Sequence, residues 1–400
     1  MSDRIASSSL TRLTVRDLAS RREAIAAAQE QVASGKRINR PSDDPAAAAR
    51  LVGIDASLTR LAQFERNAGS AESSLAMQET VLASVVDSVQ RIRELTVQAN
   101  NGTNGAGERD AIAQEIGTRL DGLYDLANTR NSNGDALFAG SRASVTPFTP
   151  GSPTRYDGDD TARRVAIGLD REVIAAEPGS DVFMRLKDGN GRFRVAADAA
   201  NSGTGTVQPG AVTDESAFDG ARFRITFTAA DRYDISDADT GSVLQSGVAF
   251  ESGSAIELGG MTTSIDGAPS SGDAFLIEPA EQRDLFATVS ELVDTLGVSG
   301  DDAAARTERH QSMNSMLASL DLALDHLGGH RARAGARLQS VDASRSESAA
   351  VTLQLEATAA SMEDADMVDV ITRLERESQS LELLQKSYAR FASISILDYL

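Results

Sequence analysis

The side chains that could carry chemistry are few and poorly grouped. His326 and His330 lie four residues apart beside Asp325, a spacing that can place two imidazoles on one helix face around a metal ion. Gly328 and Gly329 weaken that helix, and no third ligand stands at a fixed spacing. Structural or solvated histidines are therefore the favoured interpretation, and we expect no bound metal and no cofactor.

Two other clusters resemble known sites only in part. Asp157, Asp159 and Asp160 begin like a calcium-binding loop, but no glutamate completes the loop at its far end. Residues 34–36 (SGK) lack the upstream glycine and the preceding strand of a phosphate-binding loop. The chain has no cysteine, which excludes disulfides, thiolate metal sites and cysteine nucleophiles. With no Ser/His/Asp set either, the sequence predicts no catalytic residues and no enzyme.

The charge balance limits the classes of partner. The 400 residues carry a formal net charge of −20, of which −10 falls on residues 143–280. Such acidity opposes binding to nucleic acids or anionic membranes, because like charges repel. No apolar run approaches the ~18 residues of a membrane span, and residues 1–10 lack the apolar stretch of a secretory signal. We expect neither a nucleic-acid nor a membrane partner, and no cleaved signal.

Proline divides the chain into parts of different structure. All nine prolines lie between Pro41 and Pro279, and none lies between Pro45 and Pro147. Proline removes a backbone donor and clashes with the preceding turn of a helix, so the long proline-free flanks are predicted to be helical. The central segment, residues 143–280, is then expected to have a different structure.

That central segment carries the signals of β-structure. Residues 222–228 (RFRITFT) alternate apolar and polar side chains, which is typical of a strand with one buried face. Residues 189–191 (GNG) separate two short apolar runs and predict a β-hairpin formed by residues 182–186 and 193–195.

Both flanks show the apolar spacing of packed helices. Apolar residues seven apart occur at Leu75, Leu82 and Val89, and again at Met313, Leu320 and Leu327. Asp44 precedes Pro45, which predicts a helix start, because aspartate can cap the first turn and proline fits its first position.

The predicted fold class is mainly α with an inserted β-rich domain, a discontinuous helical bundle and paired terminal coiled-coil helices. The predicted domains are a bundle of residues 46–142 and 281–355, an inserted domain of residues 143–280, and terminal helices of residues 1–45 and 356–400. The two halves of the bundle must meet in space although the insert separates them in sequence.

The terminal helices carry narrow apolar seams that little else in the chain is left to cover. An ordinary intramolecular bundle is one interpretation of these seams. The favoured one is that the ends are disordered in the monomer and pack on partner helices during assembly. The predicted assembly interface consists of Leu18, Ile25, Val32, Met367, Val370, Leu374, Leu381, Leu384, Tyr388 and Phe391.

Short motifs near both ends resemble the flagellin family. Residues 32–39 (VASGKRIN) are similar to its N-terminal signature, and residues 91–103 (RIRELTVQANNGT) to its next conserved stretch. Residues 362–366 (MEDAD) resemble the capped start of its final helix. The residues that match the first signature are Ser34, Gly35, Arg37, Ile38, Asn39, Asp43 and Asp44.

Within that family, three further stretches resemble the subunits that join the hook to the filament. These are residues 393–400 (SISILDYL), residues 156–159 (YDGD) and residues 265–275 (IDGAPSSGDAF). The resemblance implies a flagellin-like helical fold and a structural, self-assembling subunit of the bacterial flagellum. It also implies export by the flagellar type III pathway without a cleaved signal, and an extracellular location at the hook–filament junction.

The implied partners are flagellin, hook-associated protein 1, further copies of the chain in one layer, and a flagellar export chaperone at the C-terminal helix. Filament flagellin is the alternative within the family. A secreted adhesin or enzyme with its site in the β insert is the alternative from a different class.

Overall fold

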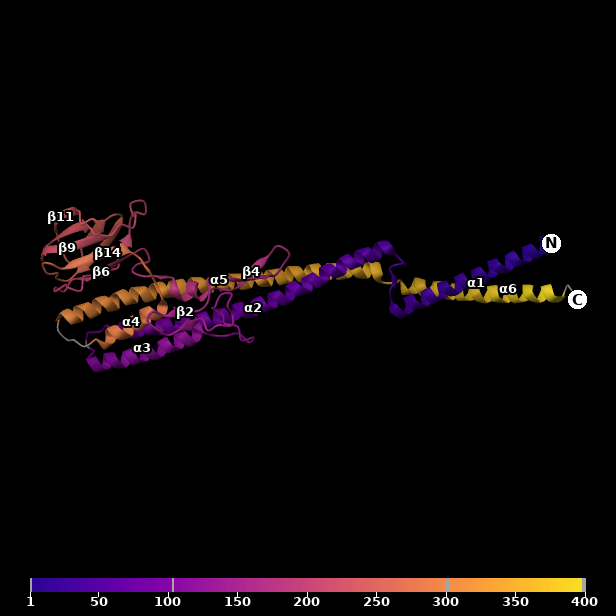
Figure 1. Ribbon diagram of the computed structural model, residues 1–400, viewed down its shortest axis with the longest axis horizontal. Coiled ribbons are helices and arrows are strands. Elements are labelled where there is room, and N and C mark those ends of the chain that lie inside the picture. The colour runs from indigo at the N-terminus through magenta and orange to yellow at the C-terminus, as the bar shows by residue number, and fades with distance from the viewer. Residues whose placement is uncertain (1, 103, 299–302, 398–400) are drawn as a thin grey trace. The chain divides into compact units, whose positions relative to one another are not determined.

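The computed structural model describes residues 2–102, 104–298 and 303–397, and most of these are helical (Figure 1). About 54% of residues are in helices and 18% in strands, which confirms the predicted mainly α fold with a β-rich insert. The helices are α1 (Ser2–Ser34), α2 (Pro45–Ala99), α3 (Ala106–Ala127), α4 (Leu285–Gly297), α5 (Ala303–Glu363) and α6 (Met367–Leu397). None of the helices within these ranges is long and apolar enough to cross a membrane.

Fifteen strands and one π-helical turn, η1 (Ser180–Met184), lie between α3 and α4. The strands are β1 (Phe148–Thr149), β2 (Arg155–Tyr156), β3 (Arg163–Ala166), β4 (Glu172–Ala176), β5 (Leu186–Lys187), β6 (Phe193–Ala197), β7 (Thr206–Val207), β8 (Ala211–Val212), β9 (Phe223–Ala229), β10 (Arg232–Asp237), β11 (Val243–Ala249), β12 (Ala255–Leu258), β13 (Met261–Asp266), β14 (Ala274–Pro279) and β15 (Gln282–Arg283).

The chain forms two compact units, and α2 and α5 contribute to both. Unit 1 comprises Met1–Arg66 and Ser344–Leu400, and unit 2 comprises Asn67–Ala343. The predicted domain limits at residues 45, 142, 280 and 355 do not coincide with this division and stay predictions.

The helical core of unit 2 is built from both sides of the β-rich insert. Val85 and Ile92 of α2, Ile116 of α3, Leu292 of α4 and Leu320 of α5 are almost completely buried in one cluster. The residues predicted from the spacing of seven are all at most 2% exposed, namely Leu75, Leu82, Val89, Met313, Leu320 and Leu327. The spacing therefore identified the buried faces of α2 and α5 correctly.

An aromatic cluster ties the segment after α3 to this helical core. Phe148 and Phe183 are fully buried and pack edge to face at 5.4 Å, and Phe286 of α4 stacks on Tyr124 of α3 at 4.3 Å. The hydroxyl of Tyr156 donates to backbone carbonyls and accepts from the Gly179 amide at 3.1 Å. Residues 156–159 (YDGD) thus pack beside the helices rather than in the larger sheets.

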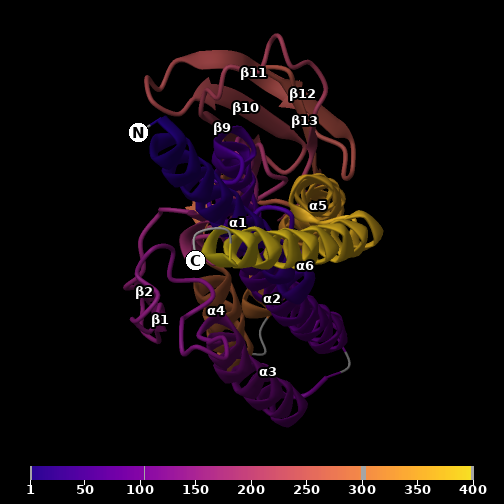
Figure 2. The same ribbon diagram turned by 90° about the vertical axis from the view of Figure 1, so that its right-hand side faces the viewer.

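The larger sheets share a second apolar core within unit 2. One sheet has the strand order β11-β10-β9-β14-β6, and the other has the order β12-β13-β7, with β8 also paired to β13. Figure 2 shows β9, β10 and β11 side by side. Phe223, Ile225 and Phe227 of β9 point into the core, which confirms the strand predicted from the RFRITFT alternation.

The predicted hairpin of residues 182–186 and 193–195 is wrong. A turn does form there, because the Asn190 amide donates to the Phe193 carbonyl at 3.0 Å. However, Val182 and Phe183 belong to η1 and are buried in the helical core. β6 instead pairs with β14, some 80 residues further along the chain. A local turn signal cannot reveal that a long-range pairing competes for the strand.

Removing a core side chain of α5 is expected to destabilise the protein far more than removing an exposed one. Leu320→Ala leaves a cavity and should lower the free energy of unfolding by about 2–5 kcal/mol. Leu353→Ala, at a site on the same helix that is 69% exposed, should change it by less than about 0.5 kcal/mol. Urea unfolding followed by circular dichroism measures both, and equal losses would contradict the assignment of the core.

Candidate assembly surface

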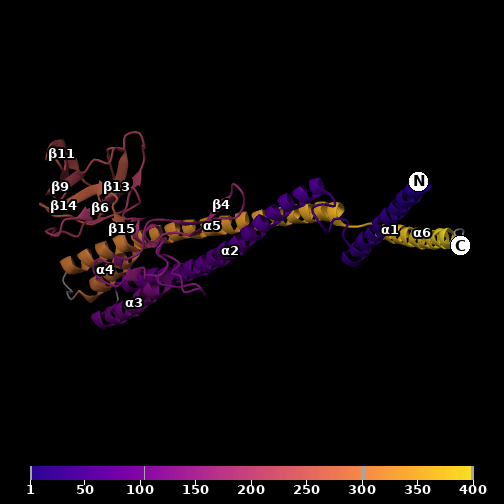
Figure 3. The same ribbon diagram turned by 45° about the vertical axis from the view of Figure 1, so that its right-hand side comes forward.

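The two terminal helices of unit 1 lie side by side and run in opposite directions (Figures 1 and 3). Near the end of α1, Gln31 Oε1 accepts a hydrogen bond of 3.0 Å from the guanidinium of Arg373, near the start of α6. Further along the pair, Arg21 forms an ion pair with Glu377. These polar contacts link α1 to α6 at two points along the pair.

A short structure at the base of this pair, which we call the clasp, consists of residues 34–44 and 361–366. The Arg37 amide donates to the Glu363 carbonyl at 2.6 Å, and the Ala365 amide donates to the Gly35 carbonyl at 3.0 Å. Gly35 has a φ of +71°, a conformation that glycine adopts without strain. The clasp therefore joins the N-terminal motif directly to the C-terminal one.

Side chains reinforce the clasp. The guanidinium of Arg37 donates to the Met362 carbonyl at 2.7 Å and to Asp44 at 3.3 Å. Lys36 pairs with Glu363 at 2.5 Å, and this hydrogen bond raises the pKa of the lysine. Ile38 is 7% exposed, one of the few buried apolar side chains in unit 1. The clasp thus consists mainly of polar contacts, and Ile38 is its one buried apolar side chain.

Two aspartates of the same motif fix the turn into α2. Asp43 accepts hydrogen bonds from the amides of Asn39 and Arg40, at 3.0 and 2.8 Å. Asp44 accepts from the Ala47 amide at 3.0 Å, which confirms its predicted role as the cap of this helix. The amide of Ala47 and then Arg37 lower the pKa of the Asp44 carboxyl.

The predicted seam residues line the helix pair but are incompletely covered. Val370 is 3% exposed, whereas Met367 and Tyr388 remain 37% and 40% exposed. The partly buried members are Leu18, Ile25, Val32, Leu374, Leu381 and Leu384. The side chain of Phe391 lies outside the described residues. That these residues contact other subunits stays a prediction.

Several apolar residues outside the predicted seam are more exposed still. On α6, Val368, Ile371 and Leu383 are 77%, 44% and 66% exposed. The prediction missed them because it followed only two rows of positions that repeat every seven residues. The signal was available, since Val368 adjoins Met367 and Leu383 adjoins Leu384. The apolar surface of α6 is thus wider than one partner helix covers.

Unit 1 as a whole buries little and exposes much apolar surface. Of the sixteen large apolar side chains found exposed among the described residues, ten lie in unit 1. They are Leu13, Val15, Val52, Val351, Leu353, Met367, Val368, Ile371, Leu383 and Tyr388. Exposed apolar surface gathered in this way is typical of a surface that binds other proteins.

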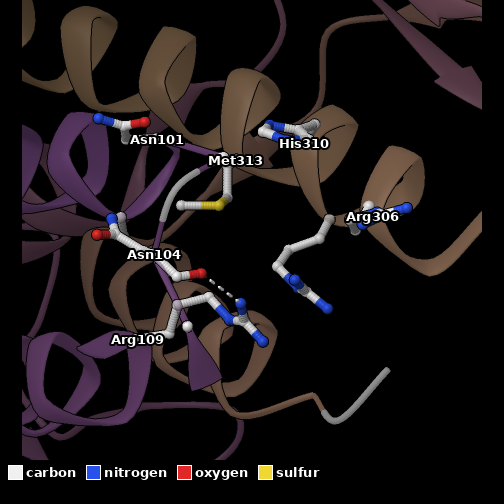
Figure 4. A pocket seen from close by; sticks show the side chains of 10 residues that line it. Asn101, Asn104, Arg109, Arg306, His310 and Met313 are labelled. Atoms are coloured by element: carbon white, nitrogen blue, oxygen red, sulfur yellow. Dashed lines mark hydrogen bonds between the residues drawn. The ribbon is translucent and has the colours of Figure 1, made fainter. Parts of the chain in front are cut away.

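Unit 2 contains a polar cavity of about 280 Å³ at the turn before α3 (Figure 4). Arg109 lines it and donates to the Asn104 carbonyl at 3.0 Å, while Arg306, His310 and Met313 come from α5. Within the described part of the chain, no three His, Cys, Asp or Glu side chains gather as a metal site.

Part of the sequence, including its N-terminal third, matches known flagellar proteins. Residues 5–143 fit the family model described as the bacterial flagellin N-terminal helical region. Over 154 residues the chain is 30% identical to flagellar hook-associated protein 3 of Escherichia coli (strain K12), a match that covers 38% of this chain and 48% of that protein. The chain thus spans about half the length of that curated relative. It is also 34% identical over 139 residues to a flagellin of Escherichia coli O127:H6, covering 35% and 25% of the two chains.

Solved structures extend the similarity over most of the chain. The crystal structure of Xanthomonas campestris FlgL (space group C2) superposes with a TM-score of 0.72 at 30% identity, covering 77% of this chain and 99% of that one. The chain belongs to the FlgL family. Hook-associated protein 3 of Legionella pneumophila, also 30% identical, gives a TM-score of 0.73 and covers 76% and 96% of the two chains. FlgL-family membership confirms the resemblance to flagellins, and the relatives named here are structural flagellar proteins rather than enzymes.

Removing the Arg37 guanidinium is expected to loosen the clasp of this FlgL-family chain. Arg37→Ala deletes both of its hydrogen bonds, and because the side chain is 47% exposed the cost should be about 1 kcal/mol. The loosening should appear as faster hydrogen exchange of the Ala365 amide and of the amide at position 37. Arg40→Ala, which removes an exposed pair with Glu30, is the matched control and should leave both amides unchanged.

Acidification is expected to release the cap of α2. The pKa of Asp44 is lowered in the folded state. Its contribution to folding stability is therefore complete above the ordinary aspartate pKa, and it disappears as the pH falls through the pKa of the folded state. The Ala47 amide chemical shift should follow this titration, with a midpoint below that of an unstructured aspartate. Asp44→Asn should abolish this titration. If the Ala47 amide of that variant still titrates as in the wild type, the capping assignment is wrong.

Proposed function

We propose that this FlgL-family protein is a structural subunit of the bacterial flagellum that assembles as a layer at the hook–filament junction. The observation that carries the proposal is the concentration of exposed apolar side chains on the paired terminal helices. Each such side chain contributes about 1.5–3 kcal/mol when it is fully buried, so contacts with neighbouring subunits can stabilise the pair considerably.

The proposed partners follow from the same surface. Helices of hook-associated protein 1 on one side, flagellin on the other, and further copies of this chain within the layer would cover the apolar side chains of unit 1. An export chaperone would cover α6 before assembly, since Val368, Ile371 and Leu383 need shielding from water. Export without a cleaved signal and an extracellular location are part of the proposal.

Two alternative functions have less support. A filament flagellin shares the terminal helices, but the solved FlgL structures match most of this chain at 30% identity. An adhesin or enzyme with its site in the β insert requires a cluster of reactive side chains there. At the five-stranded sheet, Arg194 and Arg222 are instead engaged in ion pairs with Glu278.

Deleting the gene tests the proposed function. A junction subunit is needed for the filament to attach, so the deletion strain should carry hooks without filaments and release flagellin into the medium. Restoring the gene should restore the filaments. Normal filaments in the deletion strain would refute the proposal, and electron microscopy with a flagellin immunoblot of the medium distinguishes the outcomes.

A charge on the exposed face of α6 is expected to block assembly without unfolding the monomer. Val368 is 77% exposed, so Val368→Asp should leave the circular dichroism of the free protein unchanged while complementation of motility falls at least tenfold. Burying the new carboxylate between subunits is strongly unfavourable. Ser387→Asp, at an exposed polar position of the same helix, is the matched control and should complement normally.

A further inference from the structure

The two histidines that the sequence left without a role lie together on α5. Gly328 and Gly329 do not interrupt this helix, which is continuous from Ala303 to Glu363. The rings of His326 and His330 lie 4.7 Å apart between centroids, and their Nε2 atoms are 3.1 Å apart. The two glycines therefore do not separate the rings.

Both rings face a pocket of about 390 Å³ formed with the segment after β4. His330 is 3% exposed, and its Nδ1 is hydrogen bonded to the carboxylate of Glu177. The Nε2 of His326 lies 2.8 Å from the carbonyl oxygen of Asp181. Arg337 contacts the other oxygen of Glu177 at 2.6 Å. All of these residues belong to unit 2.

The hydrogen-bond partners fix where the ring protons lie. A carbonyl oxygen only accepts, so His326 carries its proton on Nε2 and donates toward Asp181. The same proton is shared with the Nε2 of His330, which accepts the 3.1 Å contact, while the Nδ1 proton of His330 is donated to Glu177. His330 therefore directs an unprotonated nitrogen at its neighbour, while a carboxylate holds its other nitrogen.

We propose that His326 and His330 form a binding site for a divalent transition-metal ion such as zinc. Tetrahedral zinc has Zn–N bonds of about 2.0–2.1 Å, which place two nitrogen ligands roughly 3.3 Å apart. The two Nε2 atoms already stand 3.1 Å apart. The carbonyl oxygen of Asp181 is the nearest further oxygen, and water supplies the remaining coordination.

Ion binding requires one proton shift and no large movement. His326 moves its proton from Nε2 to Nδ1 and stays neutral, so the site releases no net proton. Its hydrogen bond to the Asp181 carbonyl is lost, and that oxygen then faces the ion. Glu177 holds His330 in the tautomer that a metal needs, as carboxylates beside metal-binding histidines commonly do.

Ion pairs offset much of the positive charge beside the pocket. Asp160 and Asp181 pair with Arg185, and Glu177 is paired with Arg337 and lies 3.7 Å from Arg333. Asp160 does not line the pocket, but its ion pair with Arg185 offsets part of the positive charge of Arg185, Arg333 and Arg337.

Calorimetric titration of the full-length protein with zinc chloride tests the site. The wild-type chain should bind one zinc ion, and zinc should raise its Tm, because binding to the folded state alone stabilises it. His326→Gln should abolish the saturable binding and the shift in Tm, although glutamine can still donate to the Asp181 carbonyl. Glu177→Gln should weaken binding about 10–100-fold.

The third histidine of the chain provides the matched control. His310 lies in the other cavity (Figure 4). Its Nδ1 is 2.6 Å from the side-chain oxygen of Asn100. His310→Gln should bind zinc as the wild type does, and with no cysteine present no thiol competes for the ion. The proposal is overturned if the wild type shows no saturable binding, if His326→Gln binds equally, or if His310→Gln loses the binding.

Discussion

Two backbone hydrogen bonds between residues some 330 positions apart set the arrangement of the whole of unit 1. The Arg37 and Ala365 amides donate to the Glu363 and Gly35 carbonyls, so the chain leaves α1 and enters α6 at one point. From that point the two helices run side by side. Closing so long a loop costs conformational entropy, and the side-chain contacts of Arg37 and Lys36 help to offset this cost. The residues that resemble flagellins at both ends are thus largely those that make this closure.

The clasp is important because the pair of helices α1 and α6 has few other buried contacts. Among the described residues of unit 1, the buried apolar side chains are Ala28, Ile38 and Val370. Unit 2 buries entire rows of leucine, isoleucine and phenylalanine. A pair that is anchored at its base and left apolar along its length can remain aligned yet still gain stability from added helices. The helices are thus already aligned while their apolar side chains are still exposed, which suits the proposed assembly.

Periodic patterns could be read from the sequence, whereas contacts between distant segments could not. The spacing of Leu75, Leu82 and Val89 identified a buried helix face, and Asp44 before Pro45 identified a cap, because both signals are local. Phe148 and Phe183 follow no period, so nothing in the sequence indicated that they would pack on the helices. Likewise, the spacing of His326 and His330 was visible, but Glu177 comes from a segment about 150 residues earlier and only the fold brings it near.

Among the described residues, arginine rather than lysine supplies the cation of most ion pairs. The chain contains three lysines among its 39 basic residues. A guanidinium carries several donors in a rigid plane and can bridge two acceptors at once, which an ammonium group does less well. Arg37 bridges a carboxylate and a backbone carbonyl in the clasp, and Arg185 bridges Asp160 and Asp181 beside the paired histidines. In a strongly acidic chain, such bridges allow surplus carboxylates to fix loops instead of repelling one another.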